Sequence, residues 1–280
     1  MKPVPAFTNL DRSFWAHVKL VSEKLGYSTR KKKGRAPDLR TYSIQEIKEC
    51  LAGEGLRTDH IADALGKATA EGQKLVDYLT LRRELLIQVA EPNLMNREQA
   101  KVEFERLRAA QNPKCALPMN KQKGEKRHHA YLVGIVNMLT EQALGSSEFC
   151  AEPRGLCVAT KDDLPVRTFS RWMDGAYPTV VNPAAVWEVK EYYGTKTFGS
   201  RVADGVYETM LDGEEFAEFA ANGKKRILHY LIVDDYFTWW KCGRSYLCRI
   251  VDMLHSGLVD EVLFGREVLT RWPEIVGTWP

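Results

Sequence analysis

The sequence predicts an α/β fold in which a helical domain over residues 1–115 precedes a domain of helices and strands over residues 116–280. In the first domain, apolar residues recur every three or four positions, which is typical of amphipathic helices. In the second domain, such segments alternate with short runs rich in β-branched and aromatic residues, which favour strands. Residues 112–124 are rich in Pro, Asn, Lys and Gln, so we interpret them as a linker.

Start and stop signals place the helices of the first domain. A helical apolar pattern that begins at Phe14 stops at Gly26, and Ser43 with Glu46 forms a capping box at the start of another helix. Asn96 is a good N-cap for the last helix. The predicted helices cover residues 14–25, 43–53, 59–89 and 96–110.

The second domain is predicted to alternate between helix and strand. Its strands are short apolar runs, and its helices show the longer 3.6-residue period. The predicted order is a helix at 129–144, strands at 156–160, 166–172, 179–181 and 185–192, a helix at 201–211, a strand at 227–233, and helices at 245–255 and 259–271.

The composition is that of a globular protein outside the membrane. Hydrophobic residues make up 44% and charged residues 28% of the chain. The net charge of +3 permits a nucleic-acid partner without requiring one. The six cysteines form no C-x-x-C pair, so we expect reduced thiols in a cytoplasmic protein. We see no signal peptide and no membrane-spanning stretch, and we expect no membrane partner.

The candidate catalytic residues are concentrated in the segment from Asp174 to Lys190. The turn signal Asn182-Pro183 indicates a hairpin or tight strand pair. Strand alternation then places Glu188 and Lys190 together on one face of the second strand and Trp187 on the other. Asp174, at the start of the preceding strand, can reach the same cleft as Glu188 and Lys190.

These three residue types suit metal-assisted hydrolysis of a phosphodiester bond. Two carboxylates on adjacent strands, Asp174 and Glu188, offer the oxygen ligands that Mg²⁺ prefers. A bound metal ion neutralises phosphate charge and lowers the pKa of an attacking water. Lys190 can contact the scissile phosphate or position that water. The alternative is an exposed sheet edge with an ordinary solvated face.

The pattern Asp174, Glu188-x-Lys190 resembles the PD-(D/E)xK nuclease superfamily, which includes most type II restriction endonucleases. The resemblance covers roughly residues 127–234, and Met173 stands where that family often has proline. It implies an α/β PD-(D/E)xK core with a mixed central sheet flanked by helices, in the order helix, three strands, helix, strand. It also implies Mg²⁺-dependent cleavage of double-stranded DNA and favours a site-specific restriction enzyme acting as a homodimer.

Further residues are candidates for supporting roles. The resemblance implies an additional acid on the first core helix, where Glu141 is the candidate; a solvated glutamate is the alternative. Lys196 and Arg201 could hold phosphates near the cut, or could merely flank the next helix. We expect Asp204 and Glu208 on that helix to be surface acids.

A basic run in the first domain is a candidate DNA-contacting loop. Such a segment can neutralise phosphates or enter the minor groove, although a solvated loop is the common alternative. The predicted DNA-binding residues of this loop are Arg30, Lys31, Lys32, Lys33, Arg35 and Arg40.

Two other functions are compatible with the sequence. A repair or recombination nuclease, such as a junction resolvase, would use the same three residues on branched or damaged DNA. A non-catalytic DNA-binding protein would rely on the basic loop and the helical domain alone.

The triplet Glu46-Ile-Lys48 repeats the acid-x-Lys spacing in a capped helix, with no upstream acid on a strand.

Overall fold

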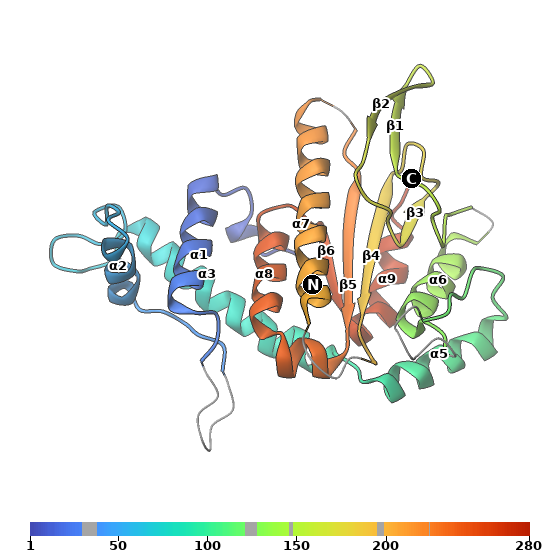
Figure 1. The fold of residues 1–280 in the computed structure, drawn as a ribbon, viewed down its shortest axis with the longest axis horizontal. Coiled ribbons are helices and arrows are strands. Elements are labelled where there is room, and N and C mark those ends of the chain that lie inside the picture. The colour runs from blue at the N-terminus through green and yellow to red at the C-terminus, as the bar shows by residue number, and fades with distance from the viewer. Residues whose placement is uncertain (30–37, 121–127, 146–147, 195–198, 224) are drawn as a thin grey trace.

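A computed structural model describes the whole chain except residues 30–37, 121–127, 146–147, 195–198 and 224. Within this part, a mixed four-stranded sheet carries helices on both faces (Figure 1). The predicted α/β class with a mixed, helix-flanked sheet is therefore confirmed.

The central sheet has the strand order β3-β4-β5-β6. Its strands are β3 (Gly175–Tyr177), β4 (Ala185–Glu191), β5 (Leu228–Asp234) and β6 (Glu261–Phe264). β3 is antiparallel to β4, whereas β4, β5 and β6 are parallel. Asn182, with φ of 54°, lies in the turn between β3 and β4, as the Asn-Pro signal predicts. The long helix α7 (Ser200–Ala221) follows β4 and makes the crossover to β5.

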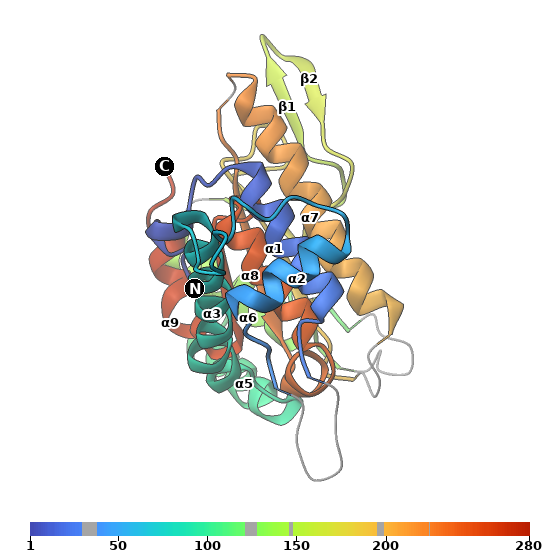
Figure 2. The same cartoon turned by 90° about the vertical axis from the view of Figure 1, so that its left-hand side faces the viewer.

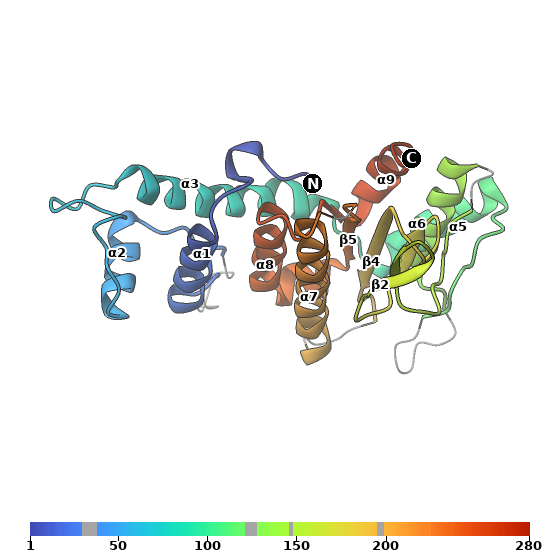
Figure 3. The same ribbon diagram turned by 90° about the horizontal axis from the view of Figure 1, so that it is seen from above.

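Alternation along β4 and β5 divides the core into two layers. The helices α7 and α8 (Arg244–His255) cover one face, and α5 (Arg97–Gln111), α6 (Tyr131–Leu144) and α9 (Val268–Val276) cover the other. Viewed from above, the sheet separates these two groups (Figure 3). Trp187 and Ile232 pack on the α6 side, while Leu231 packs on the α8 side.

A separate antiparallel hairpin, β1 (Val158–Lys161) and β2 (Leu164–Thr168), projects beyond the end of α7 (Figures 1 and 2). Asp162 and Asp163 form its turn with positive φ angles. Directly after β2, Phe169 packs against Phe216 of α7. The strand predicted at 179–181 lies earlier, at residues 175–177, because 179–181 form an irregular connection bonded to β1.

The N-terminal part is helical, as predicted. It comprises the 3₁₀ turn η1 (Pro5–Phe7), α1 (Arg12–Leu25), α2 (Ile44–Gly53) and α3 (Ala70–Leu85), which continues through the π-helical turn η2 (Leu86–Ala90) into α4 (Glu91–Asn93). The capping boxes at Ser43 and Asn96 are both present. The helix predicted from residue 59 begins only at Ala70, because residues 58–69 form turns closed by Thr69.

Helix α5 packs with the sheet rather than with the N-terminal helices, although the sequence grouped it with them. Its Phe104 lies against α6, where a Cβ on Gly134 would come within 2.4 Å of the Phe104 ring. This contact needs a glycine on α6, because any larger residue would push the two helices apart. The N-terminal helical part therefore ends before α5, near residues 90–94.

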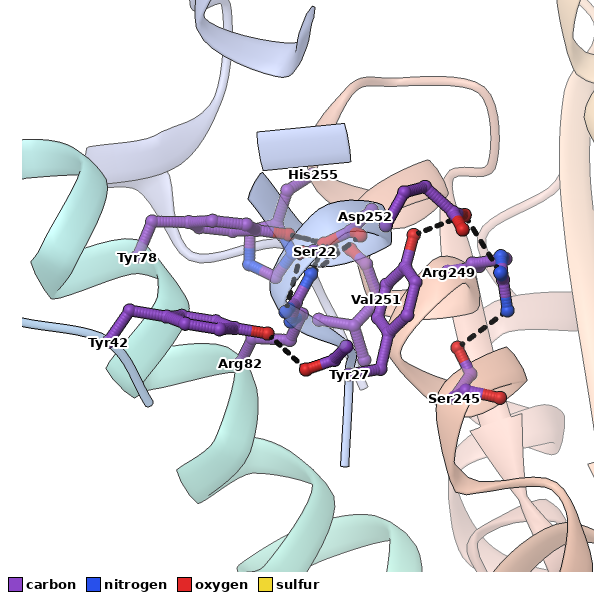
Figure 4. A network of polar contacts seen from close by, with 12 residues as sticks. Ser22, Tyr27, Tyr42, Tyr78, Arg82, Ser245, Arg249, Val251, Asp252 and His255 are labelled. Atoms are coloured by element: carbon purple, nitrogen blue, oxygen red, sulfur yellow. Dashed lines mark hydrogen bonds and ion pairs between the residues drawn. The ribbon is translucent and has the colours of Figure 1, made fainter. Parts of the chain in front are cut away.

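A buried polar network joins the N-terminal helices to α8 (Figure 4). Arg82 of α3 is 1% exposed and donates to both carboxylate oxygens of Asp252, at 2.9 and 3.2 Å. It also donates to Ser22 of α1, and Tyr78 donates to Asp252 at 2.7 Å. Because every charge here meets a partner, α1, α3 and α8 are held in one arrangement.

The helix predicted over residues 259–271 is wrong in its first half. Residues 261–264 form strand β6, followed by the 3₁₀ turn η4 (Gly265–Glu267) and then α9. All four strand residues are buried, and a strand buried on both faces lacks the alternation that reveals it in sequence. The π-helical segment η3 (Tyr236–Cys242) connects β5 to α8. In the part of the chain described, no helix is long and apolar enough to span a bilayer.

Candidate functional site

The β3–β4 hairpin brings Asp174 next to Glu188. Gly175 pairs with Trp187 in the antiparallel register, so the preceding Asp174 lies across from Glu188 on the same face of the sheet. The backbone N–H of Asp174 donates to the Trp187 carbonyl at 3.1 Å. Its Oδ2 accepts the N–H of Val189 at 2.8 Å. These bonds at the strand end fix the position of the Asp174 carboxylate.

Gly175 is required by an aromatic ring on the opposite face of the sheet. A Cβ at Gly175 would lie 1.9 Å from Cε2 of the Trp187 indole. Trp187 is fully buried and stacks on Trp279, with ring centroids 5.5 Å apart. The close approach of β3 to β4 therefore depends on the absence of a side chain beside Asp174.

Glu188 and Lys190 form a buried ion pair on the face of β4 that α7 covers. Lys190 Nζ lies 2.5 Å from Glu188 Oε2, and the side chains are 12% and 3% exposed. Burial alone would lower the pKa of Lys190, but the nearby carboxylates of Glu188 and Asp174 outweigh burial and raise it above its ordinary value. Lys190 therefore remains an ammonium ion throughout the physiological range.

Helix α7 contributes two more acids, and the loop before β3 contributes an arginine. Glu208 and Asp212, one helical turn apart, share a helix face. Arg171 contacts both, at 2.9 Å to Glu208 and 3.4 Å to Asp212, and Lys190 Nζ lies 3.8 Å from Glu208. Burial first, and then the charge of Glu188, raises the pKa of Asp212 to about 7.

We call Asp174, Glu188, Lys190, Glu208, Asp212 and Arg171 the acidic cluster. When all six side chains are ionised, its four carboxylates exceed its two cations by two charges. Asp212 Oδ1 is buried and lacks a hydrogen-bond partner among the described residues. An unpaired buried carboxylate oxygen is costly, and a divalent cation would offset both the charge and the missing partner. Surplus carboxylate charge of this kind favours a cation at the cluster, although among the described residues no three of its four carboxylates bring their oxygens within 4.8 Å of one another.

The predicted Asp174, Glu188 and Lys190 are thus brought together, whereas Glu141 is not. Glu141 lies near the end of α6, on the other side of the sheet, and accepts the backbone N–H of Lys114 with both oxygens, at 3.0 and 3.1 Å. There it holds the segment that leads from α5 to α6.

Arg40, predicted to bind DNA, makes contacts within the N-terminal part. Its guanidinium donates to the Leu25 carbonyl and, at 2.8 Å, to Glu46. The other basic residues predicted for this role, Arg30, Lys31, Lys32, Lys33, Arg35 and Lys196, lie outside the described residues, as does the side chain of Arg201 in α7.

Two other acidic residues, Glu46 of the second acid-x-Lys triplet and Asp234 at the end of β5, have structural roles. Glu46 completes the capping box of α2, and Lys48 donates to the carbonyl of Asp63, so the second acid-x-Lys triplet makes local contacts. Asp234 accepts N–H groups from Met95 and Asp235 and a hydroxyl from Tyr193. Burial raises the pKa of Asp234 to about 7.

Sequence reasoning missed Asp212 and Arg171. Glu208 was expected to be a surface acid, yet it is 3.8 Å from Lys190. The available signal was the four-residue step from Glu208 to Asp212, which places both on one helix face. Nothing in the sequence showed that this face would meet β4.

The fold and the acidic cluster define an α/β protein with buried carboxylates and cations where a strand hairpin meets its crossover helix. Residues 95–279 match a domain of unknown function, DUF7687, and residues 1–89 match another, DUF7690. Since the first match covers more than half of the chain, the chain belongs to the DUF7687 family. No match was found among curated proteins or solved structures.

Proposed function

We propose that this protein is a Mg²⁺-dependent endonuclease that hydrolyses phosphodiester bonds of double-stranded DNA. The observation that carries the proposal is the meeting of Asp174, Glu188 and Lys190 on one face of the β3–β4 hairpin. These residue types, in this order on two paired strands, suit a metal ion and a phosphate placed side by side.

Asp174 and Glu188 are the residues that would hold Mg²⁺. When bound, Mg²⁺ neutralises charge on the phosphate and lowers the pKa of a coordinated water. The excess of carboxylates in the acidic cluster favours a cation at this place, as does Asp212 Oδ1, which has no hydrogen-bond partner within the described part of the chain.

Lys190 would act as a fixed positive charge. Since its pKa is raised, the ammonium ion would not serve as a general base near neutral pH. It would instead donate a hydrogen bond to a phosphate oxygen or hold the attacking water in line. The contact with Glu188 positions the ammonium for that task.

Within this proposal, the favoured activity is that of a cytoplasmic, homodimeric type II restriction endonuclease. The elements α6, β3, β4, α7 and β5 follow one another along the chain, with the β1–β2 hairpin inserted after α6. This order, with β4 and β5 parallel, supports a core like that of the PD-(D/E)xK nucleases. The N-terminal helices and residues 30–40 would then contact the DNA outside the cleavage site.

The test is cleavage of unmethylated plasmid DNA by the full chain with Mg²⁺ or with EDTA. We expect discrete fragments with Mg²⁺ only, and none from Lys190→Ala. Lys48→Ala, which alters the acid-x-Lys triplet of α2, is the matched control and should cleave like the wild type. Cleavage by Lys190→Ala at the wild-type rate would overturn the proposed site.

The other two functions predict different outcomes. Preferential cutting of a four-way junction over linear duplex, still dependent on Lys190, would indicate a repair or recombination nuclease. Binding of duplex DNA by both forms, with no cleavage by either, would indicate a non-catalytic DNA-binding protein. Random nicking or digestion only from ends would reject the restriction label.

A further inference from the structure

A second cluster of metal-ligand side chains lies in the N-terminal part, away from the acidic cluster. His17, His60 and Glu71 each offer one ligand atom, and these atoms all lie within 4.8 Å of one another, with the two histidines half-buried and Glu71 exposed. His17 belongs to α1, His60 to the turns before α3, and Glu71 to the first turn of α3. Three separate segments of the chain therefore meet there.

The two imidazoles face each other through the same type of nitrogen atom. His17 Nε2 and His60 Nε2 are 2.9 Å apart. His17 Nδ1 lies 2.7 Å from the carbonyl of Ser13, which can only accept, so Nδ1 carries the proton. The Nε2 lone pair of a neutral His17 therefore points toward His60. Histidine ligands in metal sites characteristically donate their other ring N–H in this way.

The segments that carry the ligands are tightly held. Thr69 donates its hydroxyl to the carbonyls of His60 and Ile61, and its Oγ1 accepts the N–H of Gly72. A Cβ at Gly72 would come within 2.0 Å of the Ile61 carbonyl, so the first turn of α3 lies directly on this segment. The backbone at His60 and at Glu71 is thus held in one arrangement before any ion binds, which lowers the cost of ordering a site.

We propose that His17, His60 and Glu71 form a site for a divalent transition-metal ion, with Zn²⁺ as the best match. Two imidazoles and one carboxylate are ligands for Zn²⁺ rather than for Mg²⁺. Two nitrogens on a tetrahedral Zn²⁺, with bonds of about 2.0–2.1 Å, lie roughly 3.3 Å apart. The two Nε2 atoms need to separate by only a few tenths of an ångström to reach that spacing.

Such an ion would connect α1 to the start of α3. Those helices share a buried core that includes Phe14, Val18 and Tyr78, so the ion would stabilise the N-terminal part directly. With three protein ligands, the fourth position would be left to water. This inference stands independently of the proposed nuclease activity, because it involves other residues and another class of metal.

The experiment is a Zn²⁺ titration of the full chain after chelator treatment. Calorimetry measures the binding, and the melting temperature measures the stabilisation. We expect one site per chain that Mg²⁺ in large excess does not fill. Saturation at about 100-fold over Kd should raise the melting temperature by roughly 5 °C. His17→Gln and His60→Gln should each weaken Zn²⁺ binding at least about 100-fold, and Glu71→Gln about tenfold.

Two control variants make the titration decisive. His128→Ala removes an exposed histidine outside the cluster and should bind Zn²⁺ like the wild type. Glu188→Gln should also leave this Zn²⁺ site unchanged. Absence of stoichiometric binding in the wild type would overturn the proposal and leave a simple imidazole–imidazole hydrogen bond. Equal weakening by His128→Ala, or full binding by His17→Gln and His60→Gln variants that circular dichroism shows to be folded, would also overturn it.

Discussion

Two buried ion pairs in this protein are built in opposite ways. Arg82 meets Asp252 between the N-terminal helices and α8, and there one cation faces one carboxylate, with Ser22 and Tyr78 completing the hydrogen bonds. Lys190 meets Glu188 under α7, where four carboxylates face two cations and one oxygen of Asp212 has no hydrogen-bond partner among the residues that the structure describes.

The difference distinguishes a contact that holds helices together from a cluster that can bind a ligand. A buried pair whose donors and acceptors are all used fixes one arrangement of helices. A buried cluster that keeps surplus negative charge raises the free energy of the folded chain unless a ligand compensates. The Arg82–Asp252 network therefore depends on nothing outside the chain, whereas the acidic cluster is suited to bind a cation. Four substitutions test this contrast.

The largest effect is expected for Glu188→Gln, which removes a carboxylate from the proposed metal site. Mg²⁺-dependent cleavage should fall at least about 10³-fold, which corresponds to roughly 4 kcal/mol of transition-state stabilisation. Single-turnover cleavage of a plasmid measures this loss, with thermal melting as the check on folding. Activity within tenfold of the wild type would remove Glu188 from the reaction.

Arg82→Met should disrupt the buried contact between α3 and α8. Removing one partner of a buried pair leaves Asp252 uncompensated, and we expect the free energy of unfolding to fall by about 3–5 kcal/mol. Urea denaturation measures the change. The double variant Arg82→Met/Asp252→Leu should recover much of it, since no charge then remains buried. A double variant as unstable as the single one would show that packing, not charge, is lost.

Asp212→Asn should change how stability depends on pH. The folded chain holds the Asp212 proton up to about pH 7, whereas an unfolded aspartate releases it near pH 4. Stability contributed by this group therefore falls as pH rises from about 4 to 7 and stays low above that. The variant lacks this slope and should be more stable than the wild type at pH 8 by about 2–4 kcal/mol.

Denaturation at pH 5 and pH 8 in EDTA measures the difference for Asp212→Asn. Adding Mg²⁺ at pH 8 should then stabilise the wild type more than the variant, because a bound cation favours the ionised carboxylate. Identical pH slopes for the two proteins would mean that Asp212 titrates normally.

The smallest effect is expected for Glu208→Gln at the rim of the acidic cluster. Its side chain is 40% exposed and its contact with Lys190 is long, at 3.8 Å. Partly exposed pairs contribute about 0–1 kcal/mol, so the melting temperature should change little and cleavage by less than about threefold. A loss comparable to that of Glu188→Gln would place Glu208 among the metal ligands.

The strand hairpin could be predicted because its period is local. Alternation along residues 185–191 assigned Glu188 and Trp187 to opposite faces, and the Asn182-Pro183 turn indicated a paired strand before it. The bounds of that strand were wrong, because it lies at residues 175–177 and not at 179–181. The contribution of α7 could not be predicted, because a helix face reveals which residues lie together and not which strand they meet. His17, His60 and Glu71 were missed for the same reason, being 11 to 54 positions apart in sequence.

The indole of Trp187 acts as a spacer for the strands that carry the acids. It lies over Gly175 on the side of the sheet remote from Glu188, so even one added methyl group there would force β3 outward. Asp174, the next residue along, would move with the strand and lose its register with Glu188. The spacing of the Asp174 and Glu188 carboxylates on one face of the sheet thus depends on an aromatic ring on the other face. A substitution at Gly175 would change that spacing without changing any charge.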